Sequence, residues 1–145
     1  MGNLSIFAER LQELLTVAEI NALTLSKRIG CGHSAISRYM AGENPSLENL
    51  IKIADYFNCS MDFLLGFTED SGNPPFLPIP PFQQRLADLL KLYGLTRYRF
   101  QKMTDLSPSL LYYYSKGQKS PTLDVVIRIA KVLECSVDFV IGRVK

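Results

Sequence analysis

Residues 25–42 have the sequence LSKRIGCGHSAISRYMAG, and residues 100–117 have the sequence FQKMTDLSPSLLYYYSKG. Each stretch contains two short helix-forming segments separated by a turn. Gly30 occupies the turn of the first stretch and Asp105 that of the second, and both residue types tolerate the left-handed backbone conformation. Both stretches end in glycine, which commonly follows the last turn of a helix. We therefore predict a pair of short helices joined by a tight turn at two places in the chain.

The similarity between these stretches extends to most of the chain. A shift of 75 residues aligns the first part of the two halves, and a shift of 76 aligns the rest after a one-residue insertion. The aligned residues include Phe7, Arg10, Leu11, Ser34, Tyr39 and Gly42 at the first shift, and Pro45, Ile53, Ala54, Cys59, Ser60, Asp62, Phe63 and Gly66 at the second. So many apolar and turn positions do not align by chance, and the halves are copies of one unit of about 60 residues.

Each copy is predicted to form five short helices. In the first of them, Phe7, Leu11 and Leu15 repeat at the spacing of one buried helix face. The expected helix-capping residues are Asn21, Gly32, Ser46 and Ser60 in the first copy, and Thr96, Ser107, Thr122 and Ser136 in the second. The predicted fold is therefore all-α, with two tandem five-helix domains at residues 1–68 and 82–145.

A proline-rich segment, residues 69–81, separates the two predicted domains. It contains the sequence SGNPPFLPIPP, and proline does not fit within a helix. We therefore expect a linker, for which two interpretations are open. The segment can be an extended, semi-rigid spacer of the polyproline type, or Phe76, Leu77 and Ile79 can fold back and pack against a domain.

The net charge of +2 conceals an asymmetry between the halves. Residues 1–70 contain five Lys/Arg and nine Asp/Glu, a net charge of −4, whereas residues 71–145 contain eleven and five, a net charge of +6. The second half is therefore expected to bind polyanions more strongly than the first. Neither a membrane-spanning apolar run nor a secretory signal is recognised, so a cytoplasmic protein with no membrane association is expected.

The composition disfavours several other functions. Cys31, Cys59 and Cys135 lack CxxC spacing and His33 is the only histidine, so neither a metal site nor a disulfide framework is expected. We interpret the cysteines as small core residues. No pairing of a nucleophile with a base and no glycine-rich phosphate loop stands out, so we predict that the protein is not an enzyme and needs no cofactor.

Residues 25–54 and 100–130 resemble the Cro/repressor-type (xenobiotic-response-element-like) helix-turn-helix family. The residues that carry the resemblance are Gly30 in the turn, Ile36 in the following helix, Gly42 after it, and Pro-Ser-Leu at residues 45–47. The resemblance covers nearly the whole chain except the linker. It implies two tandem lambda-repressor-like DNA-binding domains, in which the third helix enters the major groove of double-stranded DNA.

The resemblance also implies which residues contact DNA. In the first copy, the base-facing positions hold His33, Ser34, Ser37 and Arg38. An arginine at such a position can bind guanine through two hydrogen bonds or pair with a phosphate. His33 could also be an ordinary exposed histidine at the start of a helix.

The second copy offers fewer hydrogen-bonding groups at the base-facing positions. These positions hold Pro108, Ser109, Tyr112 and Tyr113, and the basic residues expected to contact phosphates nearby include Arg97, Lys116 and Lys119. This contrast suggests that the first copy discriminates between sequences while the second supplies affinity. Tyr112 and Tyr113 have a second interpretation as part of a protein interface, where exposed tyrosines are enriched, while Tyr114 is expected to pack inward.

The second copy departs from the family pattern at two further positions. Gln101 stands where a small residue, such as Ser26 in the first copy, permits close packing of the second and third helices. Thr104 stands where an aliphatic core residue is usual, and we expect the neighbouring Met103 to fill that space. Both departures bear on whether the second copy binds DNA.

Together these features predict a sequence-specific transcriptional regulator, expected to be a repressor, that binds double-stranded DNA. A homodimer is possible, and no segment remains for a domain that binds a small-molecule effector. The alternative is a protein-interaction module of the antirepressor or antitoxin type, in which one or both units bind a protein partner. The dependence of DNA binding on salt concentration distinguishes the two hypotheses.

Overall fold

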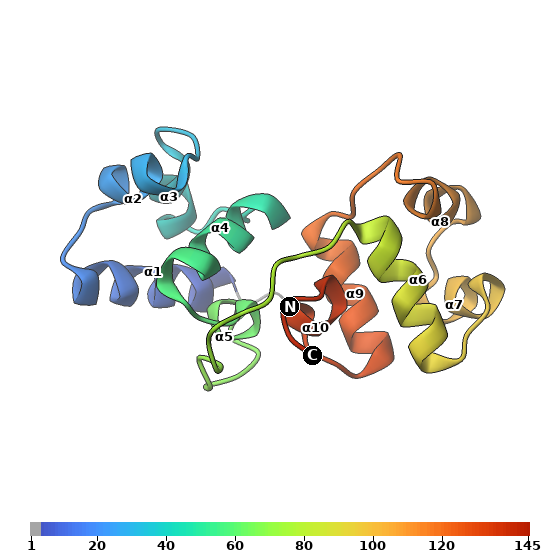
Figure 1. The fold of residues 1–145 in the computed structure, drawn as a ribbon. Helices are drawn as coiled ribbons and strands as arrows, with labels where there is room; N and C mark the ends of the chain where they lie inside the picture. The colour runs from blue at the N-terminus through green and yellow to red at the C-terminus, as the bar shows by residue number, and fades with distance from the viewer. Residues whose placement is uncertain (1–3) are drawn as a thin grey trace. The chain divides into compact units, whose positions relative to one another are not determined.

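A computed structural model describes residues 4–145. Over this range the secondary structure consists of ten helices joined by loops, with no strand (Figure 1). The all-α fold class is thus confirmed. The chain divides into two compact units, which meet in sequence between Phe76 and Leu77. We call the part up to Phe76 unit one and Leu77–Lys145 unit two. The expected start of the first domain at residues 1–3 lies outside the described residues.

The two units contain five helices each, in the same order. Unit one contains α1 (Leu4–Ala18), α2 (Ala22–Ile29), α3 (Ala35–Met40), α4 (Leu47–Phe57) and α5 (Met61–Leu65). Unit two contains α6 (Phe82–Tyr93), α7 (Arg97–Thr104), α8 (Pro108–Ser115), α9 (Leu123–Leu133) and α10 (Val137–Ile141). Within residues 4–145, no helix has the length and apolar character that crossing a membrane requires.

Side-chain caps begin most of these helices at the predicted residues. The Asn21 side chain accepts a hydrogen bond from the Thr24 backbone N–H, and Thr96 does the same for Arg99 at the equivalent place in unit two. The same arrangement begins the later helices at Ser46, Ser60, Ser107, Thr122 and Ser136. Each such cap satisfies a backbone donor that the helix itself leaves without an acceptor.

The expected cap at Gly32 is wrong. The helix α3 begins at Ala35, and the residue before it, Ser34, makes no side-chain capping bond. Glycine has no side-chain oxygen to accept a backbone N–H, and the Ala35 N–H donates instead to the Gly32 carbonyl oxygen, 3.1 Å away. His33 and Ser34 therefore lie in a turn before α3 rather than in its first helical turn.

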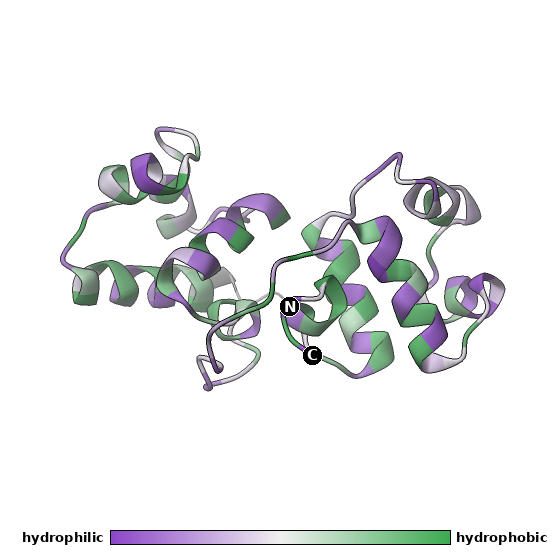
Figure 2. Cartoon of the chain, in the orientation of Figure 1, coloured by the Kyte–Doolittle hydropathy of each residue, from purple (hydrophilic) through white to green (hydrophobic). Residues whose placement is uncertain are grey.

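The core of each unit is formed by the predicted apolar faces. Hydrophobic and hydrophilic residues alternate around the helices (Figure 2), and one hydrophobic face of most helices is buried. The most deeply buried side chains include Phe7, Leu11, Leu25, Ile36, Leu50 and Ile53 in unit one, and Leu86, Phe100, Val126, Ile129 and Val140 in unit two. Burial of this kind is the main favourable contribution to folding of such small domains.

Arg10 and its counterpart Arg85, which recur in the repeat, have the same structural role in the two units. Arg10 of α1 donates to the carbonyl oxygens of Phe63 and, at 2.7 Å, of Thr68, and its guanidinium lies 4.2 Å from the centre of the Phe63 ring. Arg85 binds the carbonyl oxygens of Phe139 and Val140 and lies over the Phe139 ring in the same way. In both units an arginine thus ties the first helix to the end of the fifth.

The proline-rich segment makes contacts with each unit. The Ser71 carbonyl oxygen accepts from the Ser60 N–H at 2.8 Å in unit one, and the Leu77 N–H donates to the Arg143 carbonyl oxygen at 2.8 Å in unit two. Phe76 is half-buried, whereas Leu77 and Ile79 remain 40% and 37% exposed. The segment therefore packs in part on each unit while keeping much of its apolar surface accessible.

The prediction that Met103 fills the space beside Thr104 is wrong. Met103 is 41% exposed, whereas Thr104 is only 1% exposed and is itself the core residue. The Thr104 hydroxyl donates to the Phe100 carbonyl oxygen at 2.8 Å. A hydroxyl that bonds back to its own helix in this way can be buried without an unsatisfied donor.

Candidate nucleic-acid interface

In unit one, α2, the turn at Gly30 and α3 form the predicted helix-turn-helix. Gly30 has φ +73°, and its N–H donates to the Ser26 carbonyl oxygen at 3.0 Å. Within α3, Ile36 and Tyr39 are buried while Ser37 and Arg38 are exposed. His33 and Ser34, in the turn before α3, are also exposed, so the four predicted base-facing residues are all accessible to a partner.

Two of these four residues contact each other. Arg38 donates through Nη1 to the Ser34 hydroxyl and through Nε to a carboxylate oxygen of Glu43 at 3.1 Å. About half of the surface of each side chain in the Arg38–Glu43 pair stays exposed. Glu43 also donates its backbone N–H to the Arg38 carbonyl oxygen at 3.0 Å. The loop after α3 therefore brings a carboxylate back to the predicted guanine-binding arginine.

Glu43 is a site residue that the sequence analysis did not assign. Its distance from Arg38, five residues, exceeds the usual spacing of ion pairs along a helix. The contact forms because the chain leaves α3 at Gly42, which has φ +108°. An acidic residue directly after that glycine is the sequence feature that could have suggested it.

Contacts with neighbouring helices hold the helix-turn-helix in place behind this exposed face. The Tyr39 hydroxyl accepts from the Asn49 amide of α4 at 2.8 Å, and its ring lies 6.0 Å from that of Phe7. Arg28 of α2 donates to the Tyr56 hydroxyl of α4 at 2.6 Å. The recognition face is thus supported by α1 and α4, and its position does not depend on exposed side chains alone.

In unit two, α7, a turn at Asp105 and α8 form the equivalent motif. Asp105 has φ +57°, as predicted for a residue that replaces the turn glycine. Tyr114 is 2% exposed, whereas Tyr112 and Tyr113 are 48% and 38% exposed. This confirms the predicted directions of the three consecutive tyrosines. Burial raises the pKa of the Tyr114 phenol above its ordinary value.

Lysines lie over the exposed tyrosines of unit two. The ammonium groups of Lys116 and Lys119 lie 5.7 and 5.2 Å from the ring centres of Tyr112 and Tyr113. On α7, Lys102 lies 5.4 Å from the ring centre of Tyr98, a residue that the sequence analysis did not assign. Lysine–aromatic contacts of this type are attractive, and here they bring cations and aromatic rings together on α7, on α8 and in the loop after α8.

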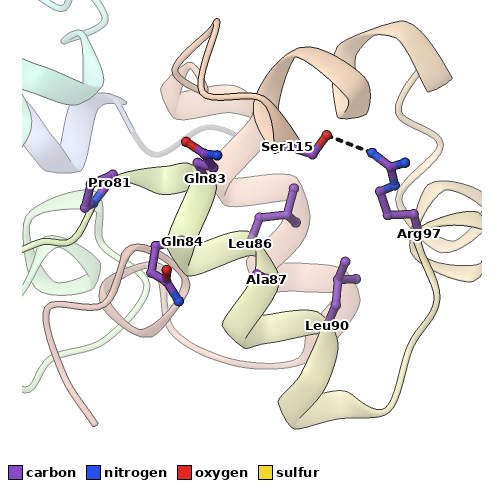
Figure 3. Close-up of a pocket in the computed structure, with 8 residues that line it drawn as sticks. All are labelled: Pro81, Gln83, Gln84, Leu86, Ala87, Leu90, Arg97 and Ser115. Atoms are coloured by element: carbon purple, nitrogen blue, oxygen red, sulfur yellow. Dashed lines mark hydrogen bonds between the residues drawn. The ribbon is translucent and has the colours of Figure 1, made fainter.

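The helix-turn-helix of unit two is bordered by two cavities. One cavity has a volume of about 530 Å³ and lies between α6 and the Arg97–Ser115 pair. Leu86 and Leu90 of α6 are among its lining residues (Figure 3). In that pair the Arg97 guanidinium donates to the Ser115 hydroxyl at 2.7 Å. The second cavity, of about 370 Å³, lies where α7 faces α8, and it includes Tyr98 and Tyr112. Ser109 is exposed at the start of α8 and lines neither cavity.

Among residues 4–145, no group of three or more His, Cys, Asp or Glu side chains is arranged to hold a metal ion. Cys31, Cys59 and Cys135 do not form disulfides, and Cys59 is buried while the other two are partly exposed. Hydroxyls, aromatic rings and cations are among the exposed groups near α3 and α8. These are the groups through which proteins bind phosphates and base edges.

Comparison with known families agrees with this arrangement. The sequence model of the helix-turn-helix family matches residues 11–64 and 86–140. Neither the curated proteins nor the solved structures that were compared include a match to the chain. The two matched ranges cover most of the chain and fall one in each structural unit. The chain therefore belongs to the helix-turn-helix family of Cro and C1 type, a family of DNA-binding regulators, and contains two tandem copies of its domain.

Proposed function

We propose that this protein is a transcriptional repressor that binds specific double-stranded DNA sequences, with α3 of unit one as the main reader in the major groove. The observation that carries the proposal is the exposed face formed by His33, Ser34, Ser37 and Arg38, in which Arg38 is held by Ser34 and Glu43. A guanidinium held in one orientation loses less conformational freedom when it binds guanine. Its two hydrogen bonds to guanine discriminate against the other bases.

Unit two is proposed to enter an adjacent major groove with α8 and to supply mainly affinity. Arg97, Lys116 and Lys119 are exposed on or beside its helix-turn-helix, and phosphate contacts of this kind strengthen binding without selecting sequence. Tyr112 and Tyr113 can contact thymine methyl groups through their rings. Since the two readers differ, the binding site of one chain should be asymmetric.

The regulatory action that requires nothing beyond DNA binding is occlusion of a promoter. A repressor of this kind needs only a DNA-binding surface, whereas an activator would also need a contact with the transcription machinery. A homodimer would present four helix-turn-helix motifs, and successive half-sites on one face of DNA lie about 34 Å apart. The length of DNA protected in a footprint distinguishes one bound chain from two.

The decisive experiment is the selection of binding sites from random duplex DNA with the full chain, followed by affinity measurements on the selected site. Arg38→Ala should weaken specific binding by about 5- to 150-fold, the loss expected for one bidentate base contact. Lys91→Ala, which removes one positive charge from α6 outside the predicted contact residues, serves as the matched control. Equal losses for the two variants would contradict α3 as the reader.

A second function is favoured by the net charge of −4 over residues 1–70 and by the exposure of Tyr112 and Tyr113. In this alternative, a helix-turn-helix surface binds a protein partner in the manner of an antirepressor or antitoxin. DNA affinity that is insensitive to salt, and unchanged in Arg38→Ala and Lys116→Ala, would favour it over DNA binding.

A further inference from the structure

The cavity between α7 and α8 has an aromatic and apolar lining with polar groups beside it. Two aromatic side chains line it, Tyr98 from the first turn of α7 and Tyr112 from α8. Pro108 and Leu111 supply further apolar lining, and Arg97 and Gln101 supply polar groups. Its volume of about 370 Å³ lies in the range of sites that bind small organic groups. We call this cavity the tyrosine crevice.

The equivalent place in unit one has neither aromatic residue. The 75-residue shift puts Leu23 at the position of Tyr98 and Ser37 at that of Tyr112, while Ala22 replaces Arg97. Ser26, the counterpart of Gln101, is 2% exposed. The two units share one fold, so these differences do not follow from what the fold requires.

Gln101 accounts for part of the difference between the units. Its side chain is partly buried, and its amide nitrogen donates to the Leu106 carbonyl oxygen in the turn between α7 and α8, at 2.8 Å. A side chain of this size occupies the position where serine lies in unit one. The departure from the family pattern thus places an amide at the edge of the crevice, where it can donate to or accept from a ligand.

Positive charge surrounds the tyrosine crevice. Between residues 97 and 121 the chain has five basic residues and a single acidic one, Asp105. The ammonium groups of Lys102 and Lys116 lie 5.4 and 5.7 Å from the ring centres of the two crevice tyrosines, and the Tyr113 ring contacts that of Tyr112 edge-on at 5.8 Å. A ligand that suits this surface combines a flat aromatic group with negative charge nearby.

We propose that the tyrosine crevice binds an unpaired base of single-stranded DNA. A base can stack on Tyr98 or Tyr112, while Arg97 and the lysines neutralise the flanking phosphates, which is the combination that single-strand binding requires. Bases in a duplex are stacked on both faces and are therefore not accessible to such a crevice. This activity does not rest on duplex recognition by unit one, because it uses other residues, and the two can fail separately.

The test measures binding of the full chain to a fluorescein-labelled strand of about a dozen thymidines, near the upper end of known single-strand site sizes. Tyr98→Ala and Tyr112→Ala should each weaken binding by about tenfold, because each removes a stacking partner. Tyr98→Phe and Tyr112→Phe keep the ring and should bind within about twofold of the unchanged protein. Arg38→Ala should weaken duplex binding only.

Two controls separate base stacking from general attraction to phosphates. A strand of the same length made of abasic nucleotides has the same charge and should bind at least about tenfold more weakly. Tyr93→Ala removes another exposed tyrosine of unit two, on α6, that does not line the crevice and is not a predicted DNA contact, and it should bind the thymidine strand as the unchanged protein does. If Tyr98→Ala or Tyr112→Ala fails to fold, the abasic strand and the phenylalanine variants decide the question.

Three results would overturn the proposal. The first is absence of binding to the thymidine strand at low salt, and the second is equal affinity for thymidine and abasic strands. The third is an unchanged affinity in folded Tyr98→Ala and Tyr112→Ala, or an equal loss in Tyr93→Ala, because either would remove the crevice from the binding surface.

Discussion

Arg38 owes its position to a residue in the loop that follows its helix. The Glu43 carboxylate accepts from Arg38 Nε, and the Ser34 hydroxyl accepts from Nη1. Exposed ion pairs of this kind add little to the free energy of folding, so the contact matters mainly for binding. The contact limits the orientations of the Arg38 guanidinium, and the negative charge of Glu43 opposes the pairing of Arg38 with a phosphate.

Removal of the Glu43 carboxylate is expected to reduce specificity more than affinity. Glu43→Ala should lower the ratio of specific to non-specific duplex affinity by about three- to tenfold, because Arg38 is then free to pair with any phosphate. Fluorescence anisotropy with the selected site and with a scrambled duplex measures this ratio. Glu13→Gln on α1 removes the same charge elsewhere, and an equal effect of this variant would show that net charge, not the Arg38 contact, sets the ratio.

The turn residue between the second and third helices permits a comparison within the chain. A Cβ built at Gly30 meets no atom within 4 Å, so its substitution costs backbone strain alone. Gly30→Ala should lower the free energy of unfolding by about 1–2 kcal/mol, whereas Gly30→Asp, which copies Asp105 of unit two, should cost less. Urea denaturation measures both, and an aspartate variant as unstable as the alanine variant would refute this explanation of the turn.

At the scale of secondary structure, the main difference between the units is where the third helix begins. The helix α8 begins directly after Ser107, whose hydroxyl accepts from the Leu110 N–H at 3.1 Å. The corresponding residue of unit one is Gly32, and α3 begins only at Ala35. One missing hydroxyl thus shortens the helix and leaves His33 and Ser34 in a turn.

Gly32→Ser is expected to restore this cap. A Cβ at Gly32 has its nearest neighbour, the Ala35 Cβ, at 4.0 Å, so the side chain fits. The variant should gain about 0.3 kcal/mol in the free energy of unfolding, and α3 should begin near His33. Urea denaturation and circular dichroism test this, with Gly32→Ala as the control that adds a Cβ without an oxygen. A gain as large in the control would assign the effect to backbone entropy rather than to the cap.

For the molecule as a whole, the charge asymmetry between the halves has a measurable consequence. Each phosphate contact that is lost should reduce the slope of log affinity against log salt concentration by about 0.9. The double variant Lys116→Ala, Lys119→Ala should therefore reduce the slope by about 1.8 on any duplex sequence. A similar reduction for the double variant Lys27→Ala, Arg28→Ala would mean that unit one contributes equally to phosphate binding.

Much of the architecture could be predicted because the relevant interactions are local. A capping hydroxyl, a left-handed turn residue and an apolar helix face each involve residues within about four positions of one another. The repeat supported most of these assignments by a second occurrence, but not the cap at Gly32. The errors at Gly32 and at Met103 arose where one copy departs from the other: Gly32 lacks the capping hydroxyl of Ser107, and Thr104 rather than Met103 is buried.

The candidate site was predictable only in part. The amino-acid sequence by itself determined two tandem five-helix units, their helix-turn-helix motifs and the exposed residues of their third helices. Only the tertiary structure decided that Glu43 returns to Arg38, that Thr104 rather than Met103 enters the core, and that Tyr98 and Tyr112 line one crevice. The physical reason is that these contacts depend on the path of a loop and on the packing of one helix against another, which sequence spacing along a single helix does not determine.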